Sequence, residues 1–220
     1  MNKVAVMTDS ITCIPQGLAE EYSIGVIPFH AIIDGKGYLD IEVDMGELYV
    51  RLKDKGNLPT TSAPSIGEFL QVYQELSQRT EAILHISISL TFTMGYNAAI
   101  QAKEMAREKL PKTTIEVIDS RSSTVGTLFV ALEAAMAARE GKCFDEVIEV
   151  ASSRIPRTYL LSMPASLFHF DKGGIIQEVR SWVEAESVST FRTILEVDAS
   201  TGGVMKPVTR AKTESQILKK

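Results

Sequence analysis

Short, strongly apolar segments alternate with longer amphipathic segments along the first two thirds of the chain. The apolar segments are rich in Val and Ile, which is typical of strands buried on both faces of a parallel sheet. They occupy residues 3–7, 24–29, 82–87 and 114–118, and segments of helical character occupy residues 16–22, 44–54, 65–79, 96–110 and 125–140. Strand–helix alternation of this kind predicts an α/β fold, with a parallel sheet, right-handed crossovers and helices on both faces.

The pattern changes after residue 154, where strands and turns replace this alternation. The predicted elements are helices at 144–153 and 177–184, strands at 158–163, 191–198 and 204–209, a turn at 199–203, and a helix that starts at 213 and stops almost at once. Two strands joined by a turn rich in Gly and Ser predict a hairpin. We therefore predict a parallel-sheet α/β domain over residues 1–154 and a smaller, incomplete α+β domain over residues 155–220.

Composition and charge narrow the class of protein. The chain has 220 residues, 45% of them hydrophobic, which is enough to bury a substantial core. Its net charge of −5, without a Lys/Arg-rich stripe, argues against nucleic-acid binding. No apolar run approaches the roughly 20 residues of a membrane span, and the first residues lack the pattern of a secretory signal. Cys13 and Cys143 have no metal-binding or redox spacing, so we expect two small, buried side chains in a cytoplasmic protein without membrane insertion.

Hydroxyl-rich segments follow several of the predicted strands or lie close to them. They are residues 8–10, 60–65, 89–96 and 119–123. Because the carboxyl ends of parallel strands meet at one edge of an open sheet, we expect these segments to gather there. Ser and Thr hydroxyls with few charges suit an oxyanion or a small polar head group. Each segment also has a simpler interpretation as a helix cap or an ordinary turn, and the residues alone leave both interpretations open.

Catalytic and metal chemistries have weaker support in the sequence. Ser10, His30 and Asp119 form a triad on paper, but no G-x-S-x-G motif accompanies them. No G-x-G-x-x-G follows the first strand, which disfavours dinucleotide binding. The three histidines lack metal-binding spacing, and His85 is expected to be a hydrogen-bonded core residue. The carboxylates within residues 40–44 are expected to form a solvated edge before a helix.

Taken together and in this order, these segments resemble the DegV family, the bacterial fatty-acid-binding proteins. The resemblance runs from residue 3 to about residue 217. The motifs that carry it are D-S at 9–10, T-S-A-P-S at 61–65, V-I-D-S at 117–120, K-G-G-I at 172–175 and the strand end at 207–212. Their order and spacing together are more specific than any one of them.

The resemblance implies a non-catalytic two-domain carrier that encloses one long-chain fatty acid. Its carboxylate is held by hydroxyls of the first domain and its acyl chain lies in an apolar tunnel formed largely with the second. Such proteins present the fatty acid to a separate fatty acid kinase subunit, and the bound fatty acid is the only ligand implied, with no further cofactor or metal. Carried over by matching motifs, the carboxylate site comprises Thr61, Ser62, Thr93, Met94, Gly95 and Arg210. Further residues expected to line the pocket are Asp9, Ser10, Ser89, Asp119 and Ser120.

The chain also departs from the pattern of the family. Met94 replaces a glycine and Gly95 a threonine, so the small residue has moved by one position, and Ile175 stands where the family has an arginine. The family usually continues further, and its histidine near the carboxyl end has no counterpart here. Two alternatives therefore stay open: a hydrolase or transferase with Ser10 or Ser62 as nucleophile, and a regulatory module without a ligand.

Overall fold

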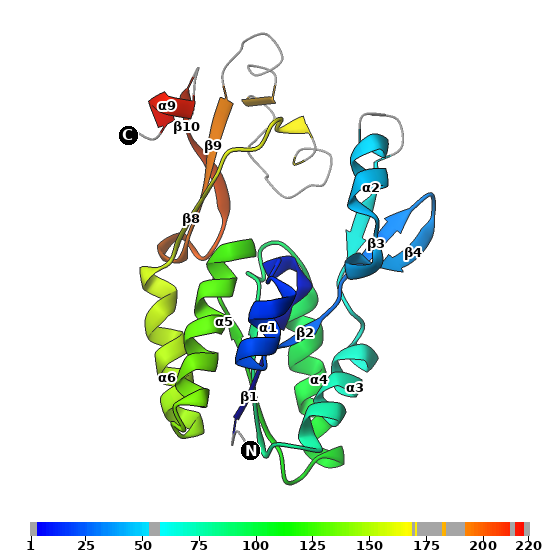
Figure 1. Cartoon of the computed structure of the whole chain (residues 1–220), viewed down its shortest axis with the longest axis vertical. Coiled ribbons are helices and arrows are strands. Elements are labelled where there is room, and N and C mark those ends of the chain that lie inside the picture. Colours follow the sequence, from blue (N-terminus) through cyan, green and yellow to red (C-terminus); the bar gives the residue numbers. More distant parts are fainter. Residues whose placement is uncertain are drawn as a thin grey trace.

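The fold is built around a parallel sheet with helices on both of its faces (Figure 1). The structure, a computed structural model, describes residues 4–52, 58–168, 170, 182–183, 192–211 and 214–217. The sheet has the order β2-β1-β6-β7, formed by β1 (Val4–Asp9), β2 (Gly25–Ile27), β6 (Ala82–Ser87) and β7 (Thr114–Asp119). All three strand pairs are parallel, which confirms the predicted α/β class.

Helices cover both faces of this sheet. One face carries α3 (Ile66–Ser77) and α4 (Gly95–Lys109), and the other carries α5 (Thr124–Arg139) and α6 (Phe144–Arg154), with α1 (Gln16–Tyr22) packed beside α5. Alternate residues of β1 serve the two faces, because Val4 and Val6 pack against α5 and α6 while Met7 packs against α3 and α4. The expectation of strands buried on both faces is confirmed.

The strand order creates a switch point between β1 and β6. The chain leaves β1 toward β2 on one side, and later places β6 and then β7 on the other side. In open α/β sheets, ligands bind at the carboxyl ends of the strands beside such a point. The segments that follow Asp9 and Ser87 are therefore in the position where a ligand site is expected.

A second, antiparallel sheet, which the apolar pattern of the sequence does not predict, lies beyond this edge. It has the order β4-β3-β5, formed by β3 (His30–Ile33), β4 (Lys36–Leu39) and β5 (Thr60–Ser62). The first half of the segment 60–65 is thus a strand and not a loop. Asp34 and Gly35 both have positive φ between β3 and β4, and an Asp-Gly pair between short apolar runs is a hairpin signal that could have revealed this sheet.

The carboxylates between β4 and β5 form a solvated edge before a helix, as expected, at Glu42 and Asp44, which are exposed. The 3₁₀ helix η2 (Asp40–Glu42) follows β4, and α2 (Met45–Arg51) follows η2. Asp44 caps α2 as expected for a carboxylate at a helix start, accepting a hydrogen bond from the Glu47 amide at 3.0 Å. Asp40, however, is only partly exposed, because its Oδ2 accepts a hydrogen bond from Ser10 Oγ at 2.6 Å.

A third sheet, also antiparallel, has the order β10-β9-β8. It consists of β8 (Tyr159–Ser162), β9 (Arg192–Asp198) and β10 (Met205–Ala211), with the 3₁₀ helix η4 (Ala199–Thr201) in the turn. The predicted hairpin is confirmed, and the short helix α9 (Glu214–Ile217) follows it. The predicted helix at 177–184, apart from Trp182 and Val183, and the K-G-G-I segment at 172–175 lie outside the described residues.

Three smaller expectations have mixed outcomes. Both Cys13 and Cys143 are exposed, so the expectation of buried thiols is wrong. His85 is fully buried and hydrogen-bonded, as expected. Within the part of the chain that the structure describes, none of the helices has the length and apolar character needed to cross a membrane.

Candidate functional site

Two of the hydroxyl segments converge on Gly95, the first residue of α4. A Cβ added to Gly95 would lie 3.5 Å from Cβ of Ala63, 3.5 Å from Cγ2 of Thr93 and 3.2 Å from Cζ of Phe29. The end of β5 and the loop at residues 89–94 therefore meet at this point. Glycine permits that approach, because a side chain here would press against the Phe29 ring.

The hydroxyls on both sides of Gly95 are accessible. Thr61 and Ser62 are exposed on β5, and Ser62 Oγ donates to the carbonyl oxygen of Ala63 at 3.2 Å. Thr93 is half-buried, and its Oγ1 accepts a hydrogen bond from the Gly95 amide at 3.2 Å. Because a hydroxyl that accepts a bond keeps its own hydrogen for donation, Thr93 can still act as a donor toward a ligand.

The helix-capping alternative holds for one residue of the segment 60–65. Ser65 caps α3 in a capping box, with its Oγ accepting from the Glu68 amide at 3.3 Å and Glu68 Oε2 accepting from the Ser65 amide at 2.7 Å. The hydrogen bonds from Ser65, reinforced by His30 at 2.8 Å, lower the pKa of Glu68. Thr61 and Ser62 take no part in this cap.

Asp9 and Ser10, at the end of β1, are engaged by other protein groups. Ser10 Oγ donates to Asp40 Oδ2 at 2.6 Å and accepts from the Phe29 amide at 2.9 Å. Asp9 is buried and accepts hydrogen bonds from three donors. These contacts tie the switch-point edge of the sheet to Phe29, whose ring in turn contacts Gly95. The partnership of Ser10 with Asp40 was not foreseen from the sequence.

Ser89 and Ser120 are fully buried and also bonded within the protein. Ser89 Oγ shares a hydrogen bond with Thr91 Oγ1 at 2.9 Å, and Ser120 Oγ shares one with Thr127 Oγ1 at 2.9 Å. Ser89 is further held by its amide, which donates to the Ser122 carbonyl oxygen at 2.7 Å. In this structure these two serines shape the loops that carry them.

Asp119 lines a cleft of about 640 Å³ on the side of β7. The cleft lies between the end of β7, the 3₁₀ helix η3 (Ile155–Arg157) and η4, and Tyr96 and Tyr159 are among its walls. Burial raises the pKa of Asp119, while the Arg121 amide, which donates to Asp119 Oδ1 at 2.8 Å, partly opposes that rise. Burial also raises the pKa of Tyr96, and nearby Asp119 adds to the effect.

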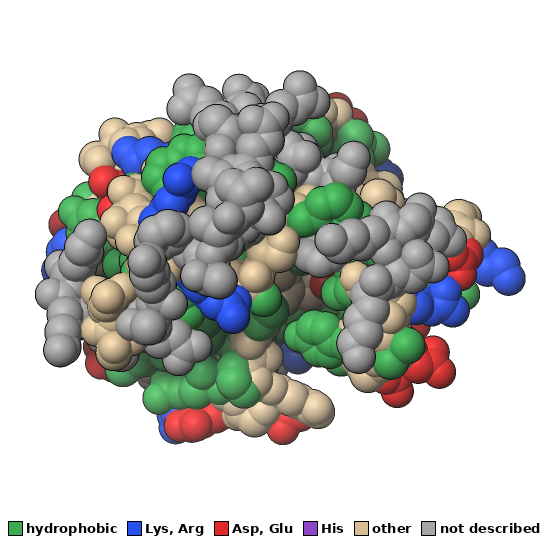
Figure 2. All heavy atoms as spheres, turned by 90° about the horizontal axis from the view of Figure 1, so that it is seen from above, with side chains coloured by type: hydrophobic (Ala, Val, Ile, Leu, Met, Phe, Trp, Pro, Cys, Tyr) green, Lys and Arg blue, Asp and Glu red, His purple; other side chains and the backbone are tan. Residues whose placement is uncertain are grey.

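An apolar cluster on the third sheet adjoins the 89–94 loop. Its buried members are Leu160, Leu167, Leu195, Val197 and Met205, with Phe92, Phe170, Trp182 and Val183 packed against them. Arg210 places its guanidinium over the Trp182 ring, 4.2 Å from the centroid. Figure 2 views the end of the molecule that carries both antiparallel sheets and shows several hydrophobic patches among the polar and charged side chains of this face. Phe92 and Thr93 are thus consecutive residues with different neighbours: Phe92 packs against the apolar cluster, and Thr93 bonds to the Gly95 amide.

The hypothetical catalytic triad of Ser10, His30 and Asp119 does not form, because each of the three side chains bonds to another group. Ser10 bonds to Asp40, His30 to Glu68, and Asp119 to the backbone of Arg121. Among the described residues there is no group of three or more His, Cys, Asp or Glu side chains arranged to hold a metal ion.

The fold and the site together define a class of α/β protein. In this class, hydroxyl segments at the carboxyl edge of a parallel sheet adjoin an apolar antiparallel sheet. A family model described as "Uncharacterised protein, DegV family" matches residues 3–220, and the chain belongs to the DegV family. The resemblance inferred from the motifs is therefore confirmed.

Individual relatives agree with this assignment. A DegV domain-containing protein of Clostridium perfringens is 33% identical over 173 residues, which are 79% of this chain and 61% of that protein. The chain thus spans about three fifths of the length of such curated relatives.

Solved structures share the fold. The crystal structure of DegV from Bacillus subtilis, described as a fatty acid binding protein, is 26% identical with a TM-score of 0.83, covering 100% of this chain and 75% of that one. A Thermus thermophilus DegV family protein, described by its fatty acid binding, is 23% identical with a TM-score of 0.83, covering 97% and 73%.

Proposed function

We propose that this chain binds one long-chain fatty acid, with its carboxylate beside Gly95 and its acyl chain along the apolar cluster of the third sheet. The observation that carries the proposal is the junction at residues 92 and 93. Phe92 packs into the apolar cluster, while Thr93 contacts the Gly95 site where β5 ends. A fatty acid changes from polar to apolar over a similarly short distance. The Bacillus subtilis relative, described as a fatty acid binding protein, supports the same ligand class.

Different residues take different parts in the proposed site. Thr61 and Thr93 donate to the carboxylate, with Ser62 and Met94 flanking them and Gly95 leaving room for the head group. Arg210, held on the Trp182 ring, places a positive charge on the apolar side that favours an anionic ligand. Asp9, Ser10, Ser89 and Ser120 are buried and bonded within the protein, so in this proposal they support the site, and Asp119 lines the neighbouring cleft.

The energetics suit a neutral hydroxyl site. Burying an acyl chain stabilises the complex by about 0.8 kcal/mol per CH₂, so the tail supplies most of the affinity. A carboxylate removed from water needs several hydrogen-bond donors, because leaving it unpaired is costly. Hydroxyls of Thr61 and Thr93 supply them without a second buried charge.

The role that follows is that of a non-catalytic carrier. A site that encloses the tail and leaves the carboxylate near exposed residues such as Met94, which is 69% exposed, suits presentation of the ligand to another protein. We propose a fatty acid kinase subunit as that partner. We further propose that residues 1–154 supply the head-group contacts and residues 155–220 the cover over the acyl chain.

Two measurements test the binding proposal. Mass spectrometry of an organic extract of the purified protein should recover a long-chain fatty acid in stoichiometric amount, and added palmitate should bind. The double variant Thr61→Val, Thr93→Val should bind palmitate more than tenfold more weakly, because two hydrogen bonds to a charged group are lost, at about 1.5–3 kcal/mol each.

The matched control is Thr114→Val, an exposed threonine at the start of β7, far along the sheet from Gly95. It should leave the affinity unchanged. Unchanged affinity in a folded double variant would contradict the two threonine assignments. Absence of both extracted and added fatty acid would contradict the function itself.

A further inference from the structure

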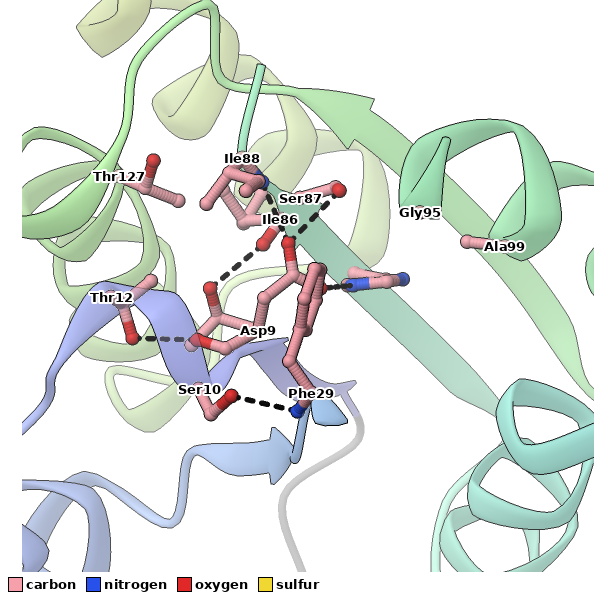
Figure 3. Close-up of polar contacts among 12 residues, drawn as sticks. Asp9, Ser10, Thr12, Phe29, Ile86, Ser87, Ile88, Gly95, Ala99 and Thr127 are labelled. Atoms are coloured by element: carbon pink, nitrogen blue, oxygen red, sulfur yellow. Dashed lines mark hydrogen bonds and ion pairs between the residues drawn. The ribbon is translucent and has the colours of Figure 1, made fainter. Parts of the chain in front are cut away.

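A chain of buried polar groups connects residues on the two sides of the 89–94 loop. Figure 3 shows its first part, in which Ser87 and Ile88 bond to Asp9. Before the loop, the Ile88 amide donates to Asp9 Oδ2 at 2.7 Å, and Asp9 Oδ1 accepts from His85 Nε2 at 3.1 Å. His85 Nδ1 is hydrogen-bonded to the Tyr73 hydroxyl at 3.1 Å. After the loop, the Tyr73 hydroxyl reaches the carbonyl oxygen of Ala99 in α4 at 3.5 Å.

The chain is sealed from solvent along its whole length. Its five residues are between 0% and 3% exposed. Ser87 Oγ adds a third donor to the Asp9 carboxylate at 3.0 Å, so Oδ2 accepts two hydrogen bonds and Oδ1 accepts one. A buried polar group that loses its partner is costly, so the loss of one contact weakens the other contacts of the network.

The network fixes the positions of backbone groups in a way that apolar packing cannot. It is surrounded by apolar side chains such as Phe69, whose ring centroid lies 5.4 Å from that of His85. Hydrocarbon side chains would fill this space without a desolvation cost. Hydrogen bonds, unlike hydrocarbon contacts, are directional, so they fix the Ile88 amide and the Ala99 carbonyl at set positions.

The Tyr73 hydroxyl stays protonated. Burial raises the pKa of the Tyr73 phenol, and the nearby Asp9 charge raises it further. Tyr73 therefore keeps its proton at any physiological pH and can donate this one hydrogen either to His85 Nδ1 or to the Ala99 carbonyl oxygen. Its partner Ala99 lies little more than one turn after Gly95, the residue on which the hydroxyl segments converge.

We propose that Asp9, His85 and Tyr73 are positioning residues that clamp both ends of the 89–94 loop and so hold Thr93 in the shape that receives a ligand carboxylate. This inference rests on the proposed fatty-acid function for its ligand. The clamp itself is a property of the ligand-free protein. None of the three side chains contacts the ligand in this arrangement; they act through Ile88 and Ala99.

The first test follows the loop without any ligand. In Tyr73→Phe, which keeps the ring and removes the hydroxyl, amide hydrogen exchange over residues 89–98 should become at least tenfold faster. Tyr22→Phe, which removes a hydroxyl from α1 on the other face of the sheet, is the matched control and should leave that exchange unchanged. Asp9→Asn should accelerate the exchange of the same amides. If Asp9→Asn does not fold, Ser87→Ala, which removes one donor to Asp9, should accelerate this exchange to a smaller extent.

The second test separates positioning from a general loss of stability. Palmitate and hexadecanol have the same chain length, but only palmitate has a carboxylate. The affinity of Tyr73→Phe for palmitate should fall at least fivefold while its affinity for hexadecanol stays within twofold of the original. Equal weakening of both ligands would overturn the positioning role.

The outcomes also distinguish this inference from the function on which it rests. Unchanged loop exchange in a folded Tyr73→Phe variant would overturn the clamp, whatever the ligand. An original chain that binds no palmitate would overturn the proposed function, and the exchange experiment would then decide on the clamp alone.

Discussion

The hydroxyl of Thr91 donates a hydrogen bond of 2.8 Å to the carbonyl oxygen of Gly203, 112 residues further along the chain. This contact joins the 89–94 loop to the tip of the β9–β10 hairpin. The same loop is anchored on the parallel sheet through the Ile88 amide and Asp9. The loop that carries Thr93 is therefore held from two sides, by the parallel sheet and by the third sheet.

Gly203→Ala should destabilise the protein at the contact between the 89–94 loop and the β9–β10 hairpin. A Cβ at Gly203 would lie 2.6 Å from Ser89 Oγ and 2.7 Å from Cα of Arg121, and the residue has φ +76°. We expect the free energy of unfolding to fall by about 2–4 kcal/mol, as for a strained and overpacked site. Gly202→Ala is the matched control, because its φ is +75° with no atom within 4 Å of an added Cβ. Urea unfolding of both variants would measure the difference; equal losses would show that backbone strain alone matters.

Asp119→Asn should become progressively more stable than the original chain as the pH rises. Burial raises the pKa of Asp119 above its ordinary value of 3.8. A carboxyl group whose pKa is raised by folding contributes stability below pH 3.8, and this contribution is lost as the pH rises through the folded value. The asparagine has no such loss and can still accept from the Arg121 amide. Urea midpoints of the two proteins at pH 3.5 and pH 7 would check this, and a constant difference between them would contradict it.

Arg210→Met should change the environment of Trp182, the single tryptophan of the chain. The guanidinium lies over the indole ring, and such a contact contributes about 0.5–1 kcal/mol at an accessible site. Methionine keeps an apolar stem but removes the charge, so we expect a shifted tryptophan emission and a palmitate affinity reduced several-fold. Arg79→Met, at an exposed position after α3, is the control and should change neither. An unchanged emission would show that the guanidinium and the indole ring do not meet in solution.

Ser65→Ala should lower the stability of the protein and should weaken the change of stability with pH between pH 3 and pH 6. Loss of this cap costs about 1 kcal/mol. Ser65 is also the main cause of the lowered pKa of Glu68, so Glu68 favours the folded state above its ordinary value of 4.5 and loses this effect as the pH falls through its folded value. The difference between Ser65→Ala and the original chain should therefore be larger at pH 6 than at pH 3. Ser65→Thr keeps a capping hydroxyl and should stay close to the original in thermal unfolding at both pH values.

The parallel sheet could be predicted because its signals are local. Val4, Val6 and Met7 are consecutive or nearly so, and a run of apolar residues indicates burial on both faces wherever it lies in the chain. The second sheet could not be predicted in the same way. Thr60–Ser62 is short, polar and exposed, and it becomes a strand because β3 pairs with it through His30, Ala31 and Ile32.

The candidate site shows the same division. Thr61 and Thr93 were named from motifs, and their segments do approach each other. Phe29 and Ala63, which complete the contact at Gly95, and Asp40, which bonds to Ser10, carry no motif that marks them. The predicted burial of both thiols is wrong because the exposure of a cysteine depends on the residues packed around it, which composition does not describe.

The sequence by itself determined the parallel sheet, the helices on its faces, the β9–β10 hairpin and membership of the DegV family, because periodicity, turn residues and motif order act between near neighbours. Only the tertiary structure decided which distant groups meet. Asp9 finds His85 and Ile88 at separations of 76 and 79 residues, Ser10 finds Asp40 at 30, and Thr91 finds Gly203 at 112. A buried hydrogen bond requires both partners to reach the same place at a set distance and angle, and that condition is met only when the whole chain has packed.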